Sequence, residues 1–191
     1  EYPDNINLIE TGLFHRFDAT NVLEQNLASI VTSIHLDHLD WLPENEQTIE
    51  KIVFEKTSTL LDSKIIVAKQ SDDKITQCIR KTLLNNSSNK IFYKESYNYA
   101  IKENNFFYYE DKFGGIKLPL PNVKGQFQLE NISTAIATVR VLKYLNIKNS
   151  HIQKGITKIH SIARLQEIKF GKLKELVKNN QLFVDGSHNP L

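Results

Sequence analysis

The sequence predicts an α/β fold in which helices cover a parallel sheet, with a small antiparallel β region alongside. Two short apolar runs, 28–34 and 64–68, have the length of buried strands. Each is followed by a segment with helical spacing of apolar residues, at 48–61 and 72–83, and this alternation is typical of a parallel sheet. The aromatic stretch 90–118 predicts antiparallel strands instead.

Local signals place the other elements of the first half. Residues 5–10 predict a strand that ends at Glu10, and a polar, turn-like segment follows as far as residue 26. Thr48 is a suitable N-cap for the 48–61 helix, because its hydroxyl can accept a backbone N–H from the first turn. Apolar residues give the 72–83 helix one face that we expect to be buried, with Cys78 on it as a core thiol.

The second half continues with turns and helices and then repeats the strand–helix pattern. Gly114-Gly115 marks a turn, and Asn131 to Leu145 is the clearest helix of the chain. The remaining expected elements are a helix at 150–159, a strand at 165–170, a helix at 172–178 and a strand at 182–185. Because the pattern restarts after Ile162, we expect a domain boundary near 160–163, which separates domains at 1–160 and 161–191.

The composition is that of an ordinary globular chain. Of its 191 residues, 40% are hydrophobic and 24% charged, and the net charge of +2 is too small to indicate nucleic-acid binding. No apolar run reaches the roughly 20 residues of a membrane span, and no signal peptide is evident at the start. With one cysteine, no internal disulfide can form. We expect a cytoplasmic monomer that binds neither nucleic acid nor membrane.

The chain contains no methionine and begins with Glu1. Residues 5–9 already have the pattern of a strand, and the chain stops soon after another strand-like run. We therefore expect a piece of a longer protein, or a processed one.

Candidate metal ligands follow two of the expected strands. Glu10 could bind Mg²⁺ through a carboxylate oxygen, although a solvated strand end is the simpler interpretation. The loop from His35 to Trp41 contains two His and two Asp, which could form a metal site or a helix-capping loop with surface histidines. Lys56 fits the exposed Glu/Lys surface of a helix without any further function.

A third group of candidates lies near the end of the chain. Asp185, at a strand end and followed by Gly, suits a ribose hydroxyl pair, and Arg164 suits a phosphate through its planar fork of donors. A structural turn at Asp185-Gly-Ser remains the alternative. The sequence contains neither the phosphate-binding Gly-x-x-x-x-Gly-Lys-[Ser/Thr] loop nor Gly-x-Gly-x-x-Gly.

Taken in order, these segments resemble the folylpolyglutamate synthase/dihydrofolate synthase branch of the Mur ligases. That branch has the pattern Glu-x-Gly-x-Gly-Gly-Arg-x-Asp-Ala-Thr-Asn, which residues 10–21 match in spacing. The other matching segments are Leu36-Asp-His38, Glu55-Lys56, Gln128-Leu-Glu-Asn131, Ala163-Arg-Leu-Gln166 and Asp185-Gly-Ser-His-Asn-Pro190. These segments stand in the order of the family and span nearly the whole chain.

The resemblance implies a fold and an activity. The fold would be a P-loop-like central domain of the Mur-ligase type, followed by the start of a Rossmann-like C-terminal domain. The activity would be ATP-dependent amide formation in folate biosynthesis: a dihydropteroate or folate carboxylate becomes an acyl phosphate, which the amine of L-glutamate attacks.

The resemblance also assigns roles to single residues. Glu10 and His38 would bind Mg²⁺, and Lys56 matches a carbamylated lysine of the family. Asp18 and Ala19 would contact the pterin. The nucleotide would meet Asn131 at the adenine, Arg164 at the phosphates and Asp185 at the ribose, with His188 near the transferred phosphate.

The sequence departs from the family pattern close to these positions. Phe14-His15 replaces Gly-Gly, Thr57-Ser58-Thr59 replaces Ala-Gly-Ile, and Ser161-Ile162 replaces Trp-Pro. The family's phosphate loop would precede residue 1, and most of its C-terminal domain would follow Pro190. We therefore expect this chain alone not to catalyse ligation.

Three hypotheses follow. The first is a segment of a bifunctional folate synthase. The second is a decayed, non-catalytic remnant of that enzyme, which the departures and the missing ends favour. The third, a Mur-type ligase of cell-wall precursors, is disfavoured by Asp18-Ala-Thr-Asn21.

Overall fold

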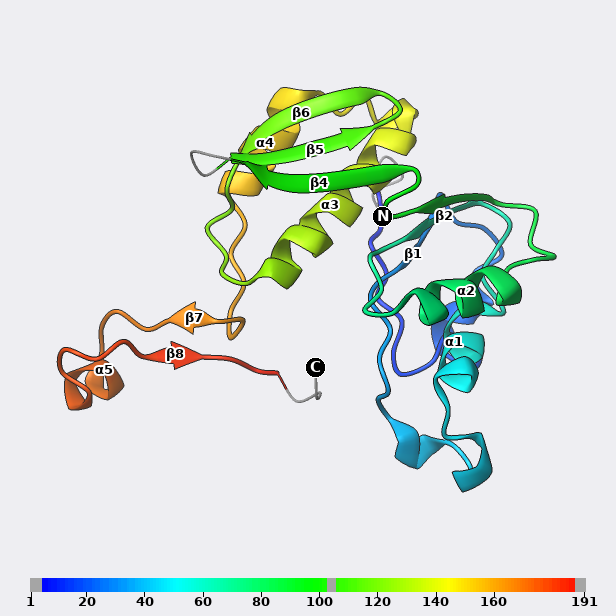
Figure 1. The fold of residues 1–191 in the computed structure, drawn as a ribbon, viewed down its shortest axis with the longest axis horizontal. Coiled ribbons are helices and arrows are strands. Elements are labelled where there is room, and N and C mark those ends of the chain that lie inside the picture. The colour runs from blue at the N-terminus through cyan, green and yellow to red at the C-terminus, as the bar shows by residue number, and fades with distance from the viewer. Residues whose placement is uncertain (1–4, 103–105, 188–191) are drawn as a thin grey trace. The chain divides into compact units, whose positions relative to one another are not determined.

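A computed structural model describes residues 5–102 and 106–187 of the chain (Figure 1). The described residues fall into two compact units, within the bounds Glu1–Ile65 with Gln70–Lys90, and Ile66–Lys69 with Ile91–Leu191. Within the described ranges, no helix is long and apolar enough to cross a membrane.

A three-stranded sheet has the order β1-β2-β3, with β1 at Ser29–Val31, β2 at Lys64–Val67 and β3 at Asn89–Phe92. Strands β2 and β3 run parallel. The amide of Asn89 donates to the carbonyl of Ser63, and four residues later the amide of Tyr93 donates to that of Val67, each at 3.2 Å. The pairing therefore advances in the same direction along both strands.

The first unit contains two helices that pack against each other, α1 (Ile49–Thr57) and α2 (Asp73–Thr82). Thr48 caps α1 as expected, because its hydroxyl accepts the amide of Lys51 at 3.2 Å. On their inner faces Ile52 and Ile79 are fully buried. Cys78 is only half-buried, so the expectation of a core thiol is wrong: it lies beside the buried stripe of α2. Three short 3-10 helices complete this unit: η1 (Ala19–Val22), η2 (Leu39–Trp41) and η3 (Glu44–Glu46).

An antiparallel sheet of the second unit is a meander of β4 (Tyr97–Lys102), β5 (Phe106–Asp111) and β6 (Gly114–Pro119). Helix α3 (Gln126–Val141) contacts β4, and α4 (Asn149–Thr157) contacts β6 (Figure 1). A short 3-10 helix, η4 (Lys143–Leu145), lies between α3 and α4 in the chain. The meander contributes Phe107, Tyr109 and Leu118 to the core, and all three side chains are buried.

The last described segment contains β7 (Gln166–Glu167), α5 (Lys172–Leu176) and β8 (Phe183–Val184). The two strands pair antiparallel. Their position in the chain matches the strand–helix–strand pattern expected there.

The structure confirms the α/β fold class, with a parallel sheet and antiparallel sheets. The strand expected at 5–10 is wrong: its apolar side chains are exposed, Leu8 to 89%, and no described strand takes up its backbone hydrogen bonds. Residues 89–92 join the parallel sheet, not the antiparallel one. The turn before β6 lies at residues 112–113, and Gly114, with φ of 97°, opens the strand. The boundary near 160–163 stays a prediction.

Candidate functional site

The segment 10–21 forms a loop that is closed by Asp18. One carboxylate oxygen accepts the amide of Thr20 at 2.9 Å and its hydroxyl at 2.5 Å, which caps the 3-10 helix η1. The other oxygen accepts the amide of Gly12 at 3.0 Å. These donors, first among them the Thr20 hydroxyl, lower the pKa of Asp18. A Cβ at Gly12 would lie 2.7 Å from this carboxylate, so the loop needs glycine for space.

The loop is attached to the end of α1 through Arg16. Its amide donates to the carbonyl of Glu55 at 3.0 Å, and its guanidinium donates to the Glu55 carboxylate at 3.1 Å. Lys51 forms a second ion pair with the same carboxylate at 3.1 Å. The side chain of Glu55 is only 5% exposed, so the two cations neutralise a carboxylate that has little access to water.

Lys56 lies beneath the same loop. Its Nζ donates to the carbonyl of Leu13 at 2.9 Å and lies 5.5 Å from the centre of the Phe14 ring. Burial lowers the pKa of Lys56, and the charge of Asp37 partly opposes this. The structure thus brings Lys56 to the loop that carries Asp18 and Ala19.

His38 has a left-handed backbone, with φ of 58°. Asp37 holds it there: one carboxylate oxygen accepts the His38 amide at 2.8 Å, and the other lies 3.1 Å from Nε2. A non-glycine residue in this region costs free energy and is frequent at functional sites. Glu10 is exposed in a segment without regular structure. Among the residues that the structure describes, no group of three His, Cys, Asp or Glu side chains is arranged to hold a metal ion.

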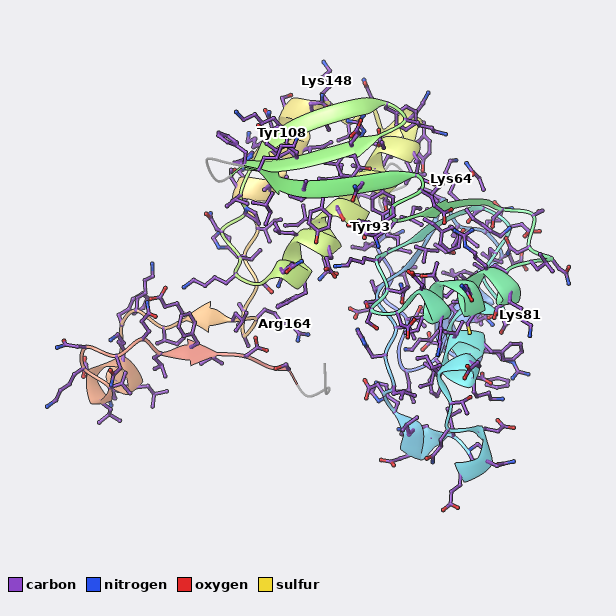
Figure 2. All side chains as sticks on the ribbon, in the orientation of Figure 1. Lys64, Lys81, Tyr93, Tyr108, Lys148 and Arg164 are labelled. Atoms are coloured by element: carbon purple, nitrogen blue, oxygen red, sulfur yellow. The ribbon has the colours of Figure 1, made fainter. Side chains whose placement is uncertain are left out.

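Two motifs of the second unit, 163–166 and 185–187, form one local structure. The carboxylate of Asp185 accepts the amides of Leu165 and Ser187, both at 2.7 Å, and these bonds lower its pKa, that from Leu165 most. The amide of Gly186 donates to the carbonyl of Ala163 at 2.7 Å. Arg164 is exposed between Ala163 and Leu165, which both have positive φ (Figure 2). The structure therefore joins the segments of Arg164 and Asp185.

Asn131 is exposed on α3. The residue before it, Glu130, belongs to an ion pair that the sequence did not predict. The carboxylate of Glu130 accepts from Lys69 at 2.6 Å and from the hydroxyl of Tyr99 at 3.4 Å. The sequence signal concerned Lys69 alone, which lies just after β2 at the carboxyl edge of a parallel sheet.

The expected site residues are divided between the two units. The first unit holds Glu10, Asp18, Ala19, His38 and Lys56, and the second holds Asn131, Arg164 and Asp185. His188 lies outside the described residues.

Two of the relatives that this chain matches in sequence share one name. The chain is 26% identical to dihydrofolate synthase/folylpolyglutamate synthase of Haemophilus influenzae, over 97% of this chain and 42% of that protein. The Escherichia coli protein of the same name is also 26% identical, over 97% of this chain and 40% of its own length. This chain therefore spans less than half of the relatives that it matches. No protein-family model matches the sequence.

Solved structures agree with these relatives. The E. coli FolC structure in complex with DHPP and ADP is 27% identical, with a TM-score of 0.72 over 94% of this chain and 39% of that one. The apo form of L. casei FPGS shares the fold, at 23% identity and a TM-score of 0.75, over 95% of this chain and 43% of that one. The chain is similar in sequence and fold to one segment of these synthases, which confirms the resemblance inferred from the motifs.

Proposed function

We propose that this chain is a segment of an ATP-dependent ligase that adds L-glutamate to dihydropteroate or folate. The observation that carries the proposal is the closed 10–21 loop, docked on α1 over Lys56, in a chain that is similar to a synthase solved with DHPP and ADP. In the reaction, ATP phosphorylates the substrate carboxylate, and the glutamate amine displaces phosphate to form the amide.

The nucleotide would bind at Asn131, Arg164 and Asp185. Arg164 is exposed, and its guanidinium presents a planar fork of donors to phosphate oxygens. Each carboxylate oxygen of Asp185 accepts one amide and retains acceptor capacity for a ribose hydroxyl. His188 would lie near the transferred phosphate.

A divalent metal, Mg²⁺ in our proposal, would be held by Glu10 and His38. Two protein ligands suit Mg²⁺, which commonly retains waters and binds phosphate oxygens at its other positions. When bound, the ion neutralises phosphate charge. Lys56 suits carbamylation because its lowered pKa favours the neutral amine that reacts with carbon dioxide.

The pterin would contact Asp18 and Ala19. The carboxylate of Asp18 is already oriented by Gly12 and Thr20, so binding would require no ordering of this side chain. Ala19 is exposed at the first position of η1.

The proposal places the protein in the cytoplasm as a monomer, and the 191-residue chain alone would be inactive. A decayed remnant is the second candidate, favoured by the departures from the family pattern. A cell-wall ligase fits less well, because Asp18-Ala-Thr-Asn21 has the spacing of the folate branch.

An assay of ATP-dependent glutamate addition to dihydropteroate tests the proposal. Two proteins are compared, the 191-residue chain and the product of the complete reading frame that contains it. We expect turnover with the second protein only, and its loss in Glu10→Ala and His38→Ala. Inactivity of both proteins would favour the remnant, and turnover by the 191-residue chain would refute its inactivity.

A further inference from the structure

Two of the three stretches at which this sequence departs from the family pattern, 14–15 and 57–59, meet in the structure. Nδ1 of His15 lies 2.8 Å from the hydroxyl of Thr59, 44 residues away in the chain. The Phe14 ring lies against Lys56, and the buried Thr57 donates its hydroxyl to the carbonyl of Val53 at 2.7 Å. His15 and Thr59, which are substituted residues from two separate motifs, therefore contact each other.

These contacts belong to a clamp between residues 13–16 of the loop and residues 55–59, which form the last turn of α1 and the turn after it. Lys56 holds the carbonyl of Leu13, Glu55 holds Arg16, and the His15–Thr59 bond lies between them in the loop sequence. Neither Phe14 nor His15 is among the described residues with positive φ. The backbone at these two positions therefore does not require glycine.

Side-chain contacts thus fix a stretch of loop where the family pattern has two glycines. Glycine leaves a chain more conformational freedom than any other residue, so Phe14 and His15 reduce the entropy that ordering the loop would otherwise cost. The His15–Thr59 bond adds a direct connection from this stretch to the turn that follows α1. Asp18 and Ala19 follow three and four residues after His15.

We infer that His15 and Thr59 are positioning residues, which hold the loop on α1 and so place Asp18 and Ala19 for the pterin substrate. The inference rests on the proposed function for its ligand. It also explains the departures at His15 and Thr59 as a matched replacement and not as independent decay.

A double-mutant cycle tests the contact in the 191-residue chain. His15→Ala and Thr59→Val each remove one partner, and Thr59→Ser keeps the hydroxyl. Unfolding by urea should show that the effects of His15→Ala and Thr59→Val are not additive, because each substitution removes the same bond. Amide exchange of residues 13–16 should accelerate in both variants and stay unchanged in Thr59→Ser. Additive effects with unchanged exchange would overturn the inference.

A kinetic assay of the complete reading frame tests the positioning role. His15→Ala and Thr59→Val should raise KM for dihydropteroate about 2–10-fold, the range for one hydrogen bond, and leave KM for ATP unchanged. Asp62→Ala is the matched control, because Asp62 accepts the amide of Ser87 at 2.9 Å elsewhere in the first unit and should lower stability alone. An equal rise in both KM values would overturn the inference. Complete inactivity of the unmutated protein would refute the proposed function, while the unfolding and exchange results would still decide the clamp.

Discussion

The carboxylate of Asp185 accepts the backbone amide of Leu165 at 2.7 Å, which joins two motifs 20 residues apart. The same carboxylate accepts the amide of Ser187, so it closes a turn and also bridges to the earlier segment that holds Leu165. The two interpretations drawn from the sequence, structural turn and ribose ligand, are therefore compatible for this residue.

Asp185→Ala should affect both functions. We expect faster amide exchange at Leu165, because its acceptor is lost, and at least tenfold weaker binding of an ATP analogue to the complete reading frame. Arg164→Ala is the comparison: it should weaken nucleotide binding and leave the exchange of Leu165 unchanged. Normal nucleotide binding by both variants would exclude these residues from the site.

Glu55→Gln tests the buried end of the ion-pair network. The amide carries no charge, so Arg16 and Lys51 would lose the negative charge that they share at a position with little access to water. The two cations remain partly exposed, which reduces the cost, and we expect a loss of about 1–3 kcal/mol in the free energy of unfolding. Urea denaturation measures this. Lys51→Met should cost less, since Arg16 still neutralises Glu55, and an equal or larger loss would contradict the network.

Gly12→Ala should open the loop at Asp18. The new methyl group would lie 2.7 Å from the Asp18 carboxylate, closer than real contacts of this kind allow, so the carboxylate must move away from its donors. The pKa of Asp18 should then rise toward its ordinary value, which carboxyl chemical shifts in an NMR titration would report. Gly155→Ala is the control, because its added Cβ meets no atom within 4 Å. An unchanged Asp18 titration in Gly12→Ala would show that the loop tolerates a side chain there.

The sequence predicted those elements whose signals are local. Thr48 as an N-cap and the apolar face of α2 depend on neighbouring residues, and both were correct. Residues 5–10 have the apolar pattern of a strand, but they are exposed and form no strand. A strand also requires a neighbouring strand to bond with, which the local pattern does not reveal.

The candidate site shows the same difference between local signals, which the sequence reveals, and distant contacts, which it does not. Motif order indicated the loop at 10–21, but no spacing in the sequence links His15 to Thr59 or Lys69 to Glu130. These pairs are set by tertiary packing between segments 44 and 61 residues apart. Glu10 and Arg164 are exposed, so their roles as ligands stay predictions for binding experiments to test.

The partial burial of His15 should make stability depend on pH. Burial lowers the pKa of His15 below 6.5, so the unfolded chain binds a proton more readily than the folded chain. Stability from this group is therefore fully present above pH 6.5 and is lost as the pH falls through 6.5 and then through the lower folded pKa. Asp18 attracts the protonated ring and limits the shift. Urea denaturation between pH 5 and 8 should show a rise in stability with pH that is smaller in His15→Gln, which cannot titrate. His35→Gln is the control, and an identical pH slope in His15→Gln and the unmutated chain would show that His15 does not couple folding to protonation.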